Sequence, residues 1–234
     1  MTGRLLKAHG IATRMQRYDD HSSAETRSWL LDIARQQPVA LVSDAGTPLI
    51  SDPGYRLVRE ARDSGIAVTS LPGACAAIAG MTLSGLPNDR FLFAGFLPVK
   101  DKARRDLIKQ FSGLAATVIF YETGPRLERS LRALADLCPE REIAVARELT
   151  KLHEECRTGT AESLADHYAV HPPRGEIVLL IGPPGEVQAT QDPDALLKEA
   201  LAELSPSKAA ARVAKATGLD RQTLYARAVE LKSP

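Results

Sequence analysis

The sequence predicts an α/β protein made of two α/β domains and a small helical module at its carboxyl end. Two patterns support this fold class. Between residues 37 and 181, short apolar runs alternate with amphipathic stretches, which is the order expected of strands joined by helices. After residue 194 only helical periodicity remains. Since 44% of the 234 residues are hydrophobic, the chain has enough apolar material for a substantial core.

The first half of the chain predicts a doubly wound arrangement. Apolar runs at residues 39–43 and 66–71 are expected to form buried strands, followed by helices over 55–64 and 74–84. Continuous apolar strands separated by single helices favour a mostly parallel sheet covered on both faces. Gly65 is well placed to end the first of these helices in the left-handed conformation.

The second half begins after an aromatic strand between proline-marked turns, PNDRFLFAGFLP, over residues 87–98. We expect the domain boundary near it, giving one domain over 1–88 and another over 89–184. Beyond the aromatic strand the pattern alternates strands and helices again. The predicted strands cover 117–121, 143–147 and 177–181, and the predicted helices cover 125–137 and 161–168.

The end of the chain predicts a linker and a helical module. Prolines, glycines and polar residues interrupt the apolar periodicity, so residues 185–193 are expected to form the linker. The module covers residues 194–234. Its three short helices are predicted near 195–204, 206–216 and 222–231, with Ser205 and Asp220 as N-caps.

Composition excludes several function classes. Lys and Arg number 30 against 29 Asp and Glu, so no global charge attracts nucleic acid or an anionic membrane. Cys75, Cys138 and Cys156 form no CxxC pair, and Arg157 stands where an HExxH motif starting at His153 needs its second histidine. We therefore predict no metal site and no disulfide framework, and we expect a reducing cytoplasm. No apolar run approaches the ~20 residues of a membrane helix, so a soluble protein without a membrane partner is expected.

Two loops carry the clearest signs of a ligand site. The segment SDAGTP, residues 43–48, follows the first predicted strand, where parallel sheets open their ligand crevices. There Gly46 permits close backbone approach, and Asp44 and Thr47 offer polar contacts. A capped tight turn explains the same residues equally well. The segment LPGACAA, residues 71–77, follows the next strand and opens a helix with small side chains. Close helix packing also favours small residues, but two such loops in consecutive units favour a shared crevice.

Dinucleotides and nucleoside triphosphates are not supported, because neither GxGxxG nor GxxxxGK[ST] follows a strand. The polar segments at residues 148–155 and 121–126 also follow predicted strands. On residue content alone, a solvated loop explains the first better than a catalytic one, and a simple turn explains the second equally well. In the module, Lys208, Arg212 and Lys215 lie on one helical face. This basic face makes docking to RNA a reasonable interpretation.

Five blocks of the sequence belong together: VALVSDAGTPLISDPGYRLVREA, LPGACAAIAGMTLSGLPNDRFLFAGFLP, FYETGPRLERSL, ARELTKLHEE and RGEIVLLIG. Taken together, they resemble the ribosomal RNA small subunit methyltransferase I family. The resemblance runs from about Gly3 to Ile181, and the helical tail resembles the family's C-terminal extension. It implies two α/β domains of the tetrapyrrole-methylase type with S-adenosylmethionine in the cleft between them. It also implies 2′-O-methylation of a cytidine ribose in 16S ribosomal RNA, by a homodimer.

The resemblance also places a site on this sequence. The implied cofactor-binding residues are Asp44, Ala45, Gly46, Thr47, Cys75, Ala76, Tyr121, Leu152, Gly175 and Glu176. Removal of a proton from a ribose hydroxyl needs a base within reach, for which the candidates are Glu122, Lys151, His153 and Glu154. We expect Lys151 or Glu154 to act at the ribose, because the loop that carries them should face the cleft.

One departure from the family pattern concerns the start of the chain. Family members begin with a strand, a TPIGNL-like loop and an AEDTR-like segment, and this sequence lacks about 40 such residues, comparable to one βαβ unit. We expect this form to bind the cofactor weakly. Two alternatives to ribosomal RNA methylation stand beside it. One is methylation of a small tetrapyrrole, against which the basic tail argues, and the other is RNA or ribosome binding without catalysis.

Overall fold

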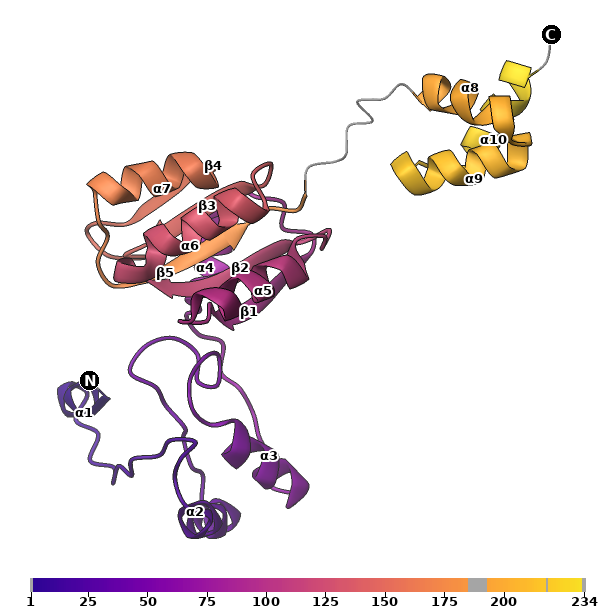
Figure 1. Ribbon diagram of the computed structural model, residues 1–234. Coiled ribbons are helices and arrows are strands. Elements are labelled where there is room, and N and C mark those ends of the chain that lie inside the picture. The colour runs from indigo at the N-terminus through magenta and orange to yellow at the C-terminus, as the bar shows by residue number, and fades with distance from the viewer. Residues whose placement is uncertain (1, 185–192, 218, 233–234) are drawn as a thin grey trace. The chain divides into compact units, whose positions relative to one another are not determined.

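The computed structural model describes residues 2–184, 193–217 and 219–232, in which ten helices and five strands are found (Figure 1). The contacts divide into two compact units, one ending at Pro183 and the other starting at Pro184. In the described ranges, every helix is too short or too polar to cross a membrane.

The first unit is built around one five-stranded sheet of order β1-β2-β5-β3-β4. Only β1 and β2 run parallel, and the other three neighbouring pairs are antiparallel. The sheet is therefore mixed. The mostly parallel sheet expected of the first half of the chain is not found among the described residues, whose strands all lie within residues 91–181. The strands are β1 (Phe91–Phe96), β2 (Thr117–Thr123), β3 (Glu142–Arg147), β4 (Glu155–Thr160) and β5 (Glu176–Ile181).

Helices cover both faces of the sheet (Figure 1). Side chains along a strand alternate between the faces, and each face has its own core. On one face, Val118, Phe120 and Leu179 pack against three helices. On the other, Ile119 and Leu180 pack against α4 (Ala76–Ser84). The three helices are α5 (Asp101–Phe111), α6 (Gly124–Leu137) and α7 (Ala161–Val170).

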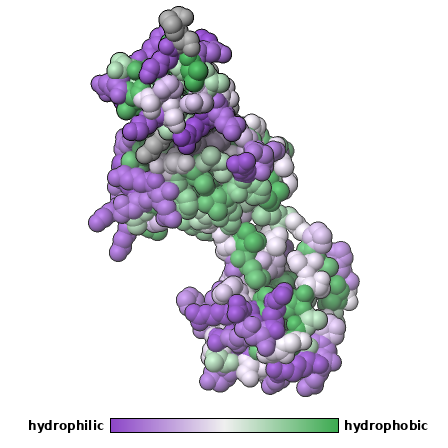
Figure 2. Space-filling view, turned by 90° about the vertical axis from the view of Figure 1, so that its right-hand side faces the viewer, coloured by the Kyte–Doolittle hydropathy of each residue, from purple (hydrophilic) through white to green (hydrophobic). Residues whose placement is uncertain are grey.

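Upstream of α4, the two strands predicted at residues 39–43 and 66–71 are wrong. Neither segment pairs with a strand among the described residues. A strand needs a neighbour for its backbone hydrogen bonds, and its apolar side chains need a covering layer. Here Val42 is 58% exposed and Leu71 is 84% exposed. Apolar side chains that remain at the surface also appear as green areas on the face shown in Figure 2.

The helices of this upstream segment are α1 (Thr2–Ala8), α2 (Ala24–Gln36) and α3 (Tyr55–Asp63). The prediction for α3 is confirmed, and Gly65 follows it with a φ of 72° as expected. An ion pair of 2.7 Å between Arg27 and Glu60 links α2 to α3.

The predicted strands and helices of residues 89–181 are confirmed, with ends that differ by one or two residues. The sequence missed β4, because ECRTGT has little apolar alternation. This strand lies at the sheet edge, and its residues are exposed or half-buried. The predicted domain boundary at residue 88 stays a prediction. On either side of it, α4 and the sheet share one core.

The second unit is a three-helix module whose apolar residues, including Leu197, Val213 and Leu224, form their own core. The predicted N-cap at Asp220 is confirmed, because its carboxylate accepts a 2.8 Å hydrogen bond from the amide of Thr223. The predicted linker at 185–193 lies, up to residue 192, outside the described residues. The helices are α8 (Pro193–Glu203), α9 (Pro206–Thr217) and α10 (Arg221–Lys232).

A buried arginine fastens the end of the sheet at which β2 starts and β5 finishes. The guanidinium of Arg141, just before β3, donates to five backbone carbonyls, and burial lowers the pKa of this group. These carbonyls belong to the end of α5, the start of β2 and the end of β5. They are those of Phe111, Ser112, Ala116, Ile181 and Gly182.

Replacement of Arg141 by Met should therefore lower the free energy of unfolding by about 3 kcal/mol, because several buried carbonyls lose their donor. Urea denaturation of the purified protein measures this change. Arg129→Met on the exposed side of α6 is the matched control and should change stability by no more than about 0.5 kcal/mol. An Arg141→Met variant as stable as that control would contradict the anchoring role.

Tyr168 on α7 is expected to make the folded state less stable at high pH. Its side chain is buried, its hydroxyl has no hydrogen-bond partner among the described residues, and burial raises its pKa to about 12. In the unfolded chain the phenol ionises near 10. Between those two values the unfolded state releases a proton that the folded state keeps, so stability falls as pH rises above 10.

Tyr168→Phe should remove this contribution. The wild type should lose unfolding free energy more steeply than the variant as pH rises from about 10 to 12, while the two should remain alike below pH 9. Chemical denaturation across that range measures the slopes. Equal slopes would show that the phenol does not titrate abnormally.

Candidate functional site

The strand directions bring the candidate residues of the second half to one edge of the sheet, namely the edge formed by the strand ends, where β1, β2 and β3 finish and β4 and β5 start. Phe96 of β1 pairs with Tyr121 of β2, and Glu176 of β5 pairs with Thr123. Arg147 pairs with both Ile177 and Glu155, which places the ends of β3 and β4 at the same edge. Tyr121, Gly175 and Glu176, together with the loop over residues 148–154, therefore lie at this edge.

Tyr121 connects this edge to the loop that precedes α4. Its hydroxyl accepts a 3.2 Å hydrogen bond from the amide of Ala77, in the first turn of α4. The N-cap residue of α4, Cys75, makes no side-chain capping bond, so the phenol supplies the acceptor that a helix start needs. Burial raises the pKa of Tyr121, and the hydrogen bond from Ala77 partly opposes that rise.

Aromatic packing fixes the ring of Tyr121. Phe93 and Phe96 contact it edge-on, with ring centroids at 4.8 Å and 5.5 Å. Cys75, Tyr121 and Leu149 pack against the same core under α4. The loop after β3 and the loop before α4 thus share one side of the sheet.

The two loops predicted as ligand-binding contact each other. The hydroxyl of Thr47 donates a 2.9 Å hydrogen bond to the carbonyl of Ala74. Gly46 has a φ of 74°, and a Cβ placed on it would have only the Ala74 carbonyl nearby, at 3.8 Å. The open space beside Gly46 leaves the backbone accessible to a ligand. Thr47 and Ala74 therefore join loop 43–48 to the start of α4.

Asp44 lies at the exposed side of the first loop. It accepts hydrogen bonds from the amide and hydroxyl of Thr2, at 3.3 Å and 3.2 Å, at the start of α1. The bond from the Thr2 amide contributes most to a pKa below the usual value for this carboxyl. Asp44 is accordingly an anion at neutral pH.

The loop over residues 148–154 has a strained backbone. Glu148 and Thr150 have φ values of 49° and 63°, which residues other than glycine rarely adopt. Lys151 pairs with Glu148 at 3.1 Å, and the Glu154 carboxylate accepts a 2.6 Å bond from the Thr150 amide. Strain of this kind gathers at functional sites.

The predicted residues at this loop are open to solvent. The side chain of Lys151 is 64% exposed and Leu152 is 92% exposed. Gly175 lies against Glu148, because a Cβ placed on it would come within 3.2 Å of the Glu148 carboxylate. Lys151, Gly175 and Glu176 therefore belong to one polar rim, and the charge of Glu176 contributes to the raised pKa of Tyr121.

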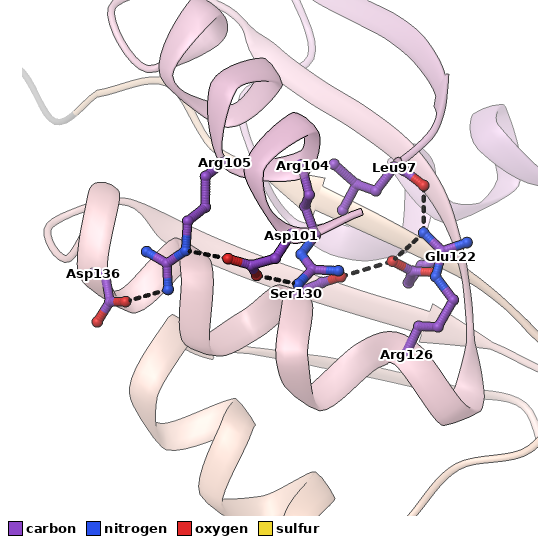
Figure 3. Close-up of polar contacts among 8 residues, drawn as sticks. All are labelled: Leu97, Asp101, Arg104, Arg105, Glu122, Arg126, Ser130 and Asp136. Carbon is purple, nitrogen blue, oxygen red and sulfur yellow. Dashed lines mark hydrogen bonds and ion pairs between the residues drawn. The ribbon is translucent and has the colours of Figure 1, made fainter. Parts of the chain in front are cut away.

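Glu122 does not fit the predicted role of a base in the cleft. It points to the face of the sheet opposite Tyr121 and is completely buried. Its carboxylate accepts a 2.7 Å hydrogen bond from the hydroxyl of Ser130 and pairs with Arg126 at 3.1 Å (Figure 3). It also accepts a 2.8 Å hydrogen bond from the amide of Thr123. With its oxygens occupied beneath α6, Glu122 cannot reach a ribose bound on the other face.

Sequence reasoning missed the residues that surround these candidates. Arg126 and Ser130 follow Glu122 at spacings of four and eight, which places them on one face of α6. That spacing was a usable signal. The aromatic contacts of Phe93 and Phe96 had none, because they depend on which strands pair.

The described residues contain no group of three or more His, Cys, Asp or Glu that could hold a metal ion. What the site offers is a set of small residues, backbone groups, one aromatic ring and a polar rim. These suit a small organic ligand that contacts the backbone at close range.

Comparison with known proteins decides among ligands of that kind. The family of "Tetrapyrrole (Corrin/Porphyrin) Methylases" matches residues 4–165. A protein of Erythrobacter litoralis called "Ribosomal RNA small subunit methyltransferase I" is 63% identical over 235 residues, covering 100% of this chain and 83% of that protein. The chain belongs to the ribosomal RNA small subunit methyltransferase I family. It is an S-adenosylmethionine-dependent methyltransferase.

Other relatives agree with this family. Proteins of the same name from Mesorhizobium japonicum and Escherichia coli O157:H7 are 50% and 42% identical. They are matched over 97% and 98% of this chain and 79% and 82% of their own length. Residues 187–232 match the "RsmI C-terminal HTH domain", in line with the three helices of the second unit.

Solved structures support the fold. A diphthine synthase aligns with a TM-score of 0.58 at 15% identity, covering 77% of this chain and 73% of its own. The methyltransferase CobJ aligns with a TM-score of 0.54 at 18% identity, covering 75% and 79%. The expected tetrapyrrole-methylase type of α/β fold is thus confirmed.

The contact between the two loops leads to a prediction that needs no cofactor. Thr47→Val should raise amide hydrogen exchange several-fold at residues 73–77, because loss of the Thr47 hydroxyl releases the Ala74 carbonyl. Mass spectrometry of exchanged peptides measures this. Thr47→Ser keeps the donor and should behave as the wild type. Unchanged exchange in Thr47→Val would mean that the loops are held together by other contacts.

Proposed function

We propose that this methyltransferase acts on 16S ribosomal RNA and methylates the 2′-hydroxyl of a cytidine ribose. Ribosomal RNA is proposed as the substrate because relatives matched over nearly the whole chain share a name that states it. The match of residues 187–232 to the "RsmI C-terminal HTH domain" supports the same substrate class. Assignment of the acceptor atom to a ribose hydroxyl rests on the family resemblance and on the carboxylate and ammonium groups at the exposed rim.

The residues present fit the cofactor. In the proposal, loop 43–48 and the start of α4 bind it through Asp44, Ala45, Gly46, Thr47, Cys75 and Ala76, and Tyr121, Leu152, Gly175 and Glu176 close the opposite side. Small side chains and the open space at Gly46 allow the backbone to approach a bulky ligand. The anionic Asp44 suits a hydroxyl or amine. When bound, S-adenosylmethionine supplies an electrophilic methyl group on a sulfonium centre.

The acceptor hydroxyl is a weak nucleophile at neutral pH, so a base within hydrogen-bond reach speeds its attack. We assign this role to Glu154, since its second carboxylate oxygen remains to accept a proton. Lys151, on the same strained loop, is placed to orient the ribose or a neighbouring phosphate with its ammonium.

The second unit is the proposed RNA-docking module. From Ser205 onward it has six Lys or Arg against two Asp or Glu. Lys208 and Arg212 lie on α9, where Arg212 is only loosely paired with Glu203, at 3.9 Å. Arg227, by contrast, is tied to Asp194 and Glu230, which raise its pKa. The cations of α9 are therefore better placed to contact phosphates.

Transfer of a labelled methyl group from S-adenosylmethionine tests the proposal. The purified protein should be incubated with unmodified small ribosomal subunits in one reaction and with naked 16S RNA in another. The RNA is then digested to nucleosides for mass spectrometry. The expected product is 2′-O-methylcytidine. A methylated base would refute the ribose assignment. RNA binding without any transfer would favour the non-catalytic alternative.

Glu154→Gln should lower the rate of methyl transfer by about 10²-fold, the contribution of a typical general base, with cofactor affinity unchanged. Single-turnover rates at saturating S-adenosylmethionine measure the loss. Lys102→Ala on the exposed side of α5 is the control and should leave the rate unchanged. A wild-type rate in Glu154→Gln would remove this residue from the mechanism.

We also propose that the chain works as a homodimer in the cytoplasm, where ribosomes are assembled. Exposed apolar side chains on α4, Ile78 and Leu83, offer surface for a second copy. Light scattering coupled to size exclusion should give twice the mass of one chain. A monomer at micromolar concentration would contradict the dimer.

A further inference from the structure

The completely buried carboxylate of Glu122 has three polar partners. The Ser130 hydroxyl and the Arg126 guanidinium lie within 3.3 Å of it (Figure 3), and so does the Thr123 amide. Replacement of a buried ion pair by well-packed apolar residues is often neutral or stabilising. A polar network at this place is therefore better explained by the orientation that it imposes.

The network closes a ring of bonds around the backbone of Tyr121. The amide of Leu97 donates to the carbonyl of Tyr121 at 3.3 Å. The carbonyl of Leu97 accepts from the guanidinium of Arg126, which pairs with Glu122, the residue next to Tyr121. The end of β1, the end of β2 and the first turns of α6 are thereby fixed to one another.

The side chain of Tyr121 points to the opposite face of the sheet from Glu122. The hydroxyl of Tyr121 meets the amide of Ala77, two residues beyond Cys75. A tilt of the strand end on the Glu122 side would therefore move the phenol away from α4. These contacts connect a buried charge on one face of the sheet with the proposed cofactor-binding loop on the other.

We infer that Glu122 is a positioning residue, which acts through Arg126 and Leu97 to hold Tyr121 against the start of α4 and so shapes the cofactor-binding loop. This inference rests on the proposed cofactor site. Glu122 does not touch the reacting atoms. Its effect should appear in cofactor affinity and leave the chemical step nearly unchanged.

Glu122→Gln keeps the size of the side chain and removes its charge. We expect the Kd of S-adenosylmethionine to rise about tenfold, since partners that orient a ligand-binding residue contribute on this scale. The KM for S-adenosylmethionine should rise with it, while kcat at saturating cofactor stays within about threefold. Isothermal titration and initial rates measure both on the full chain.

Ser130→Ala is the milder variant, because it deletes one 2.7 Å hydrogen bond to Glu122 and retains the ion pair. It should raise the Kd about threefold, and it keeps the inference testable if Glu122→Gln does not fold. Arg141→Met is the matched control for general weakening of the sheet. It disrupts a buried arginine at the opposite edge, where Ala116 and Gly182 lie, and should leave the Kd within about twofold of the wild type.

A double-mutant cycle tests whether Glu122 acts through the phenol. Tyr121→Phe removes the hydroxyl that meets Ala77. In that background Glu122→Gln should raise the Kd by no more than about twofold further. Additive effects would show that Glu122 acts by another route.

The inference would be overturned if the Kd of S-adenosylmethionine stayed within twofold of the wild type in both Glu122→Gln and Ser130→Ala. It would also be overturned if Arg141→Met raised this Kd as much as Glu122→Gln does. The proposed function fails in a different way. In that case the wild type itself neither binds S-adenosylmethionine nor transfers its methyl group, whatever residue stands at position 122.

Discussion

The interaction on which the sheet edge depends is the ion pair between Glu122 and Arg126 inside the protein. A carboxylate without exposure to water is tolerated only with compensating donors, and here a guanidinium, a hydroxyl and an amide provide them. To do so, the first turns of α6 must lie directly beneath the end of β2, and β1 must end where Arg126 reaches Leu97. The demands of one buried charge thus set the relative placement of three elements.

Neighbouring residues of β2 point to opposite faces of the sheet. Even-numbered Phe120 and Glu122 face α6, and odd-numbered Ile119 and Tyr121 face α4. The alternation of a strand therefore separates the structural network from the proposed cofactor side by only the thickness of the backbone. A site built in this way receives its rigidity from one layer and its ligand contacts from another.

The sequence predicted well where local pattern and tertiary environment agree. Continuous apolar runs such as EIVLLI, residues 176–181, became buried strands, and Gly65 and Asp220 end and begin helices as expected. It failed where pairing partners decide. The runs at 39–43 and 66–71 resemble buried strands but have no ladder among the described residues, while polar ECRTGT is a strand because β3 pairs with it.

For the site, the sequence singled out two loops that lie in contact, but it could not assign side chains to the faces of the sheet. Thr47 and Ala74 do meet, as expected for loops that share a crevice. Glu122 was misjudged because a conspicuous acid after an apolar strand resembles a catalytic group, and only the register of β2 with β5 shows on which side it lies. The contacts of Leu149 with the core beneath α4 likewise follow from three-dimensional packing that no local pattern encodes.

The five carbonyls held by Arg141 have a mechanical consequence. Two of them, those of Ile181 and Gly182, are among the last backbone groups before the chain leaves the first unit. A pull on the chain beyond Gly182 would therefore act first on the bonds that this guanidinium makes at the very end of β5. The load is then shared with the start of β2 and the end of α5. Arg141 thereby ties the exit of the chain from the first unit to β2 and α5, at the end of β5 opposite Glu176.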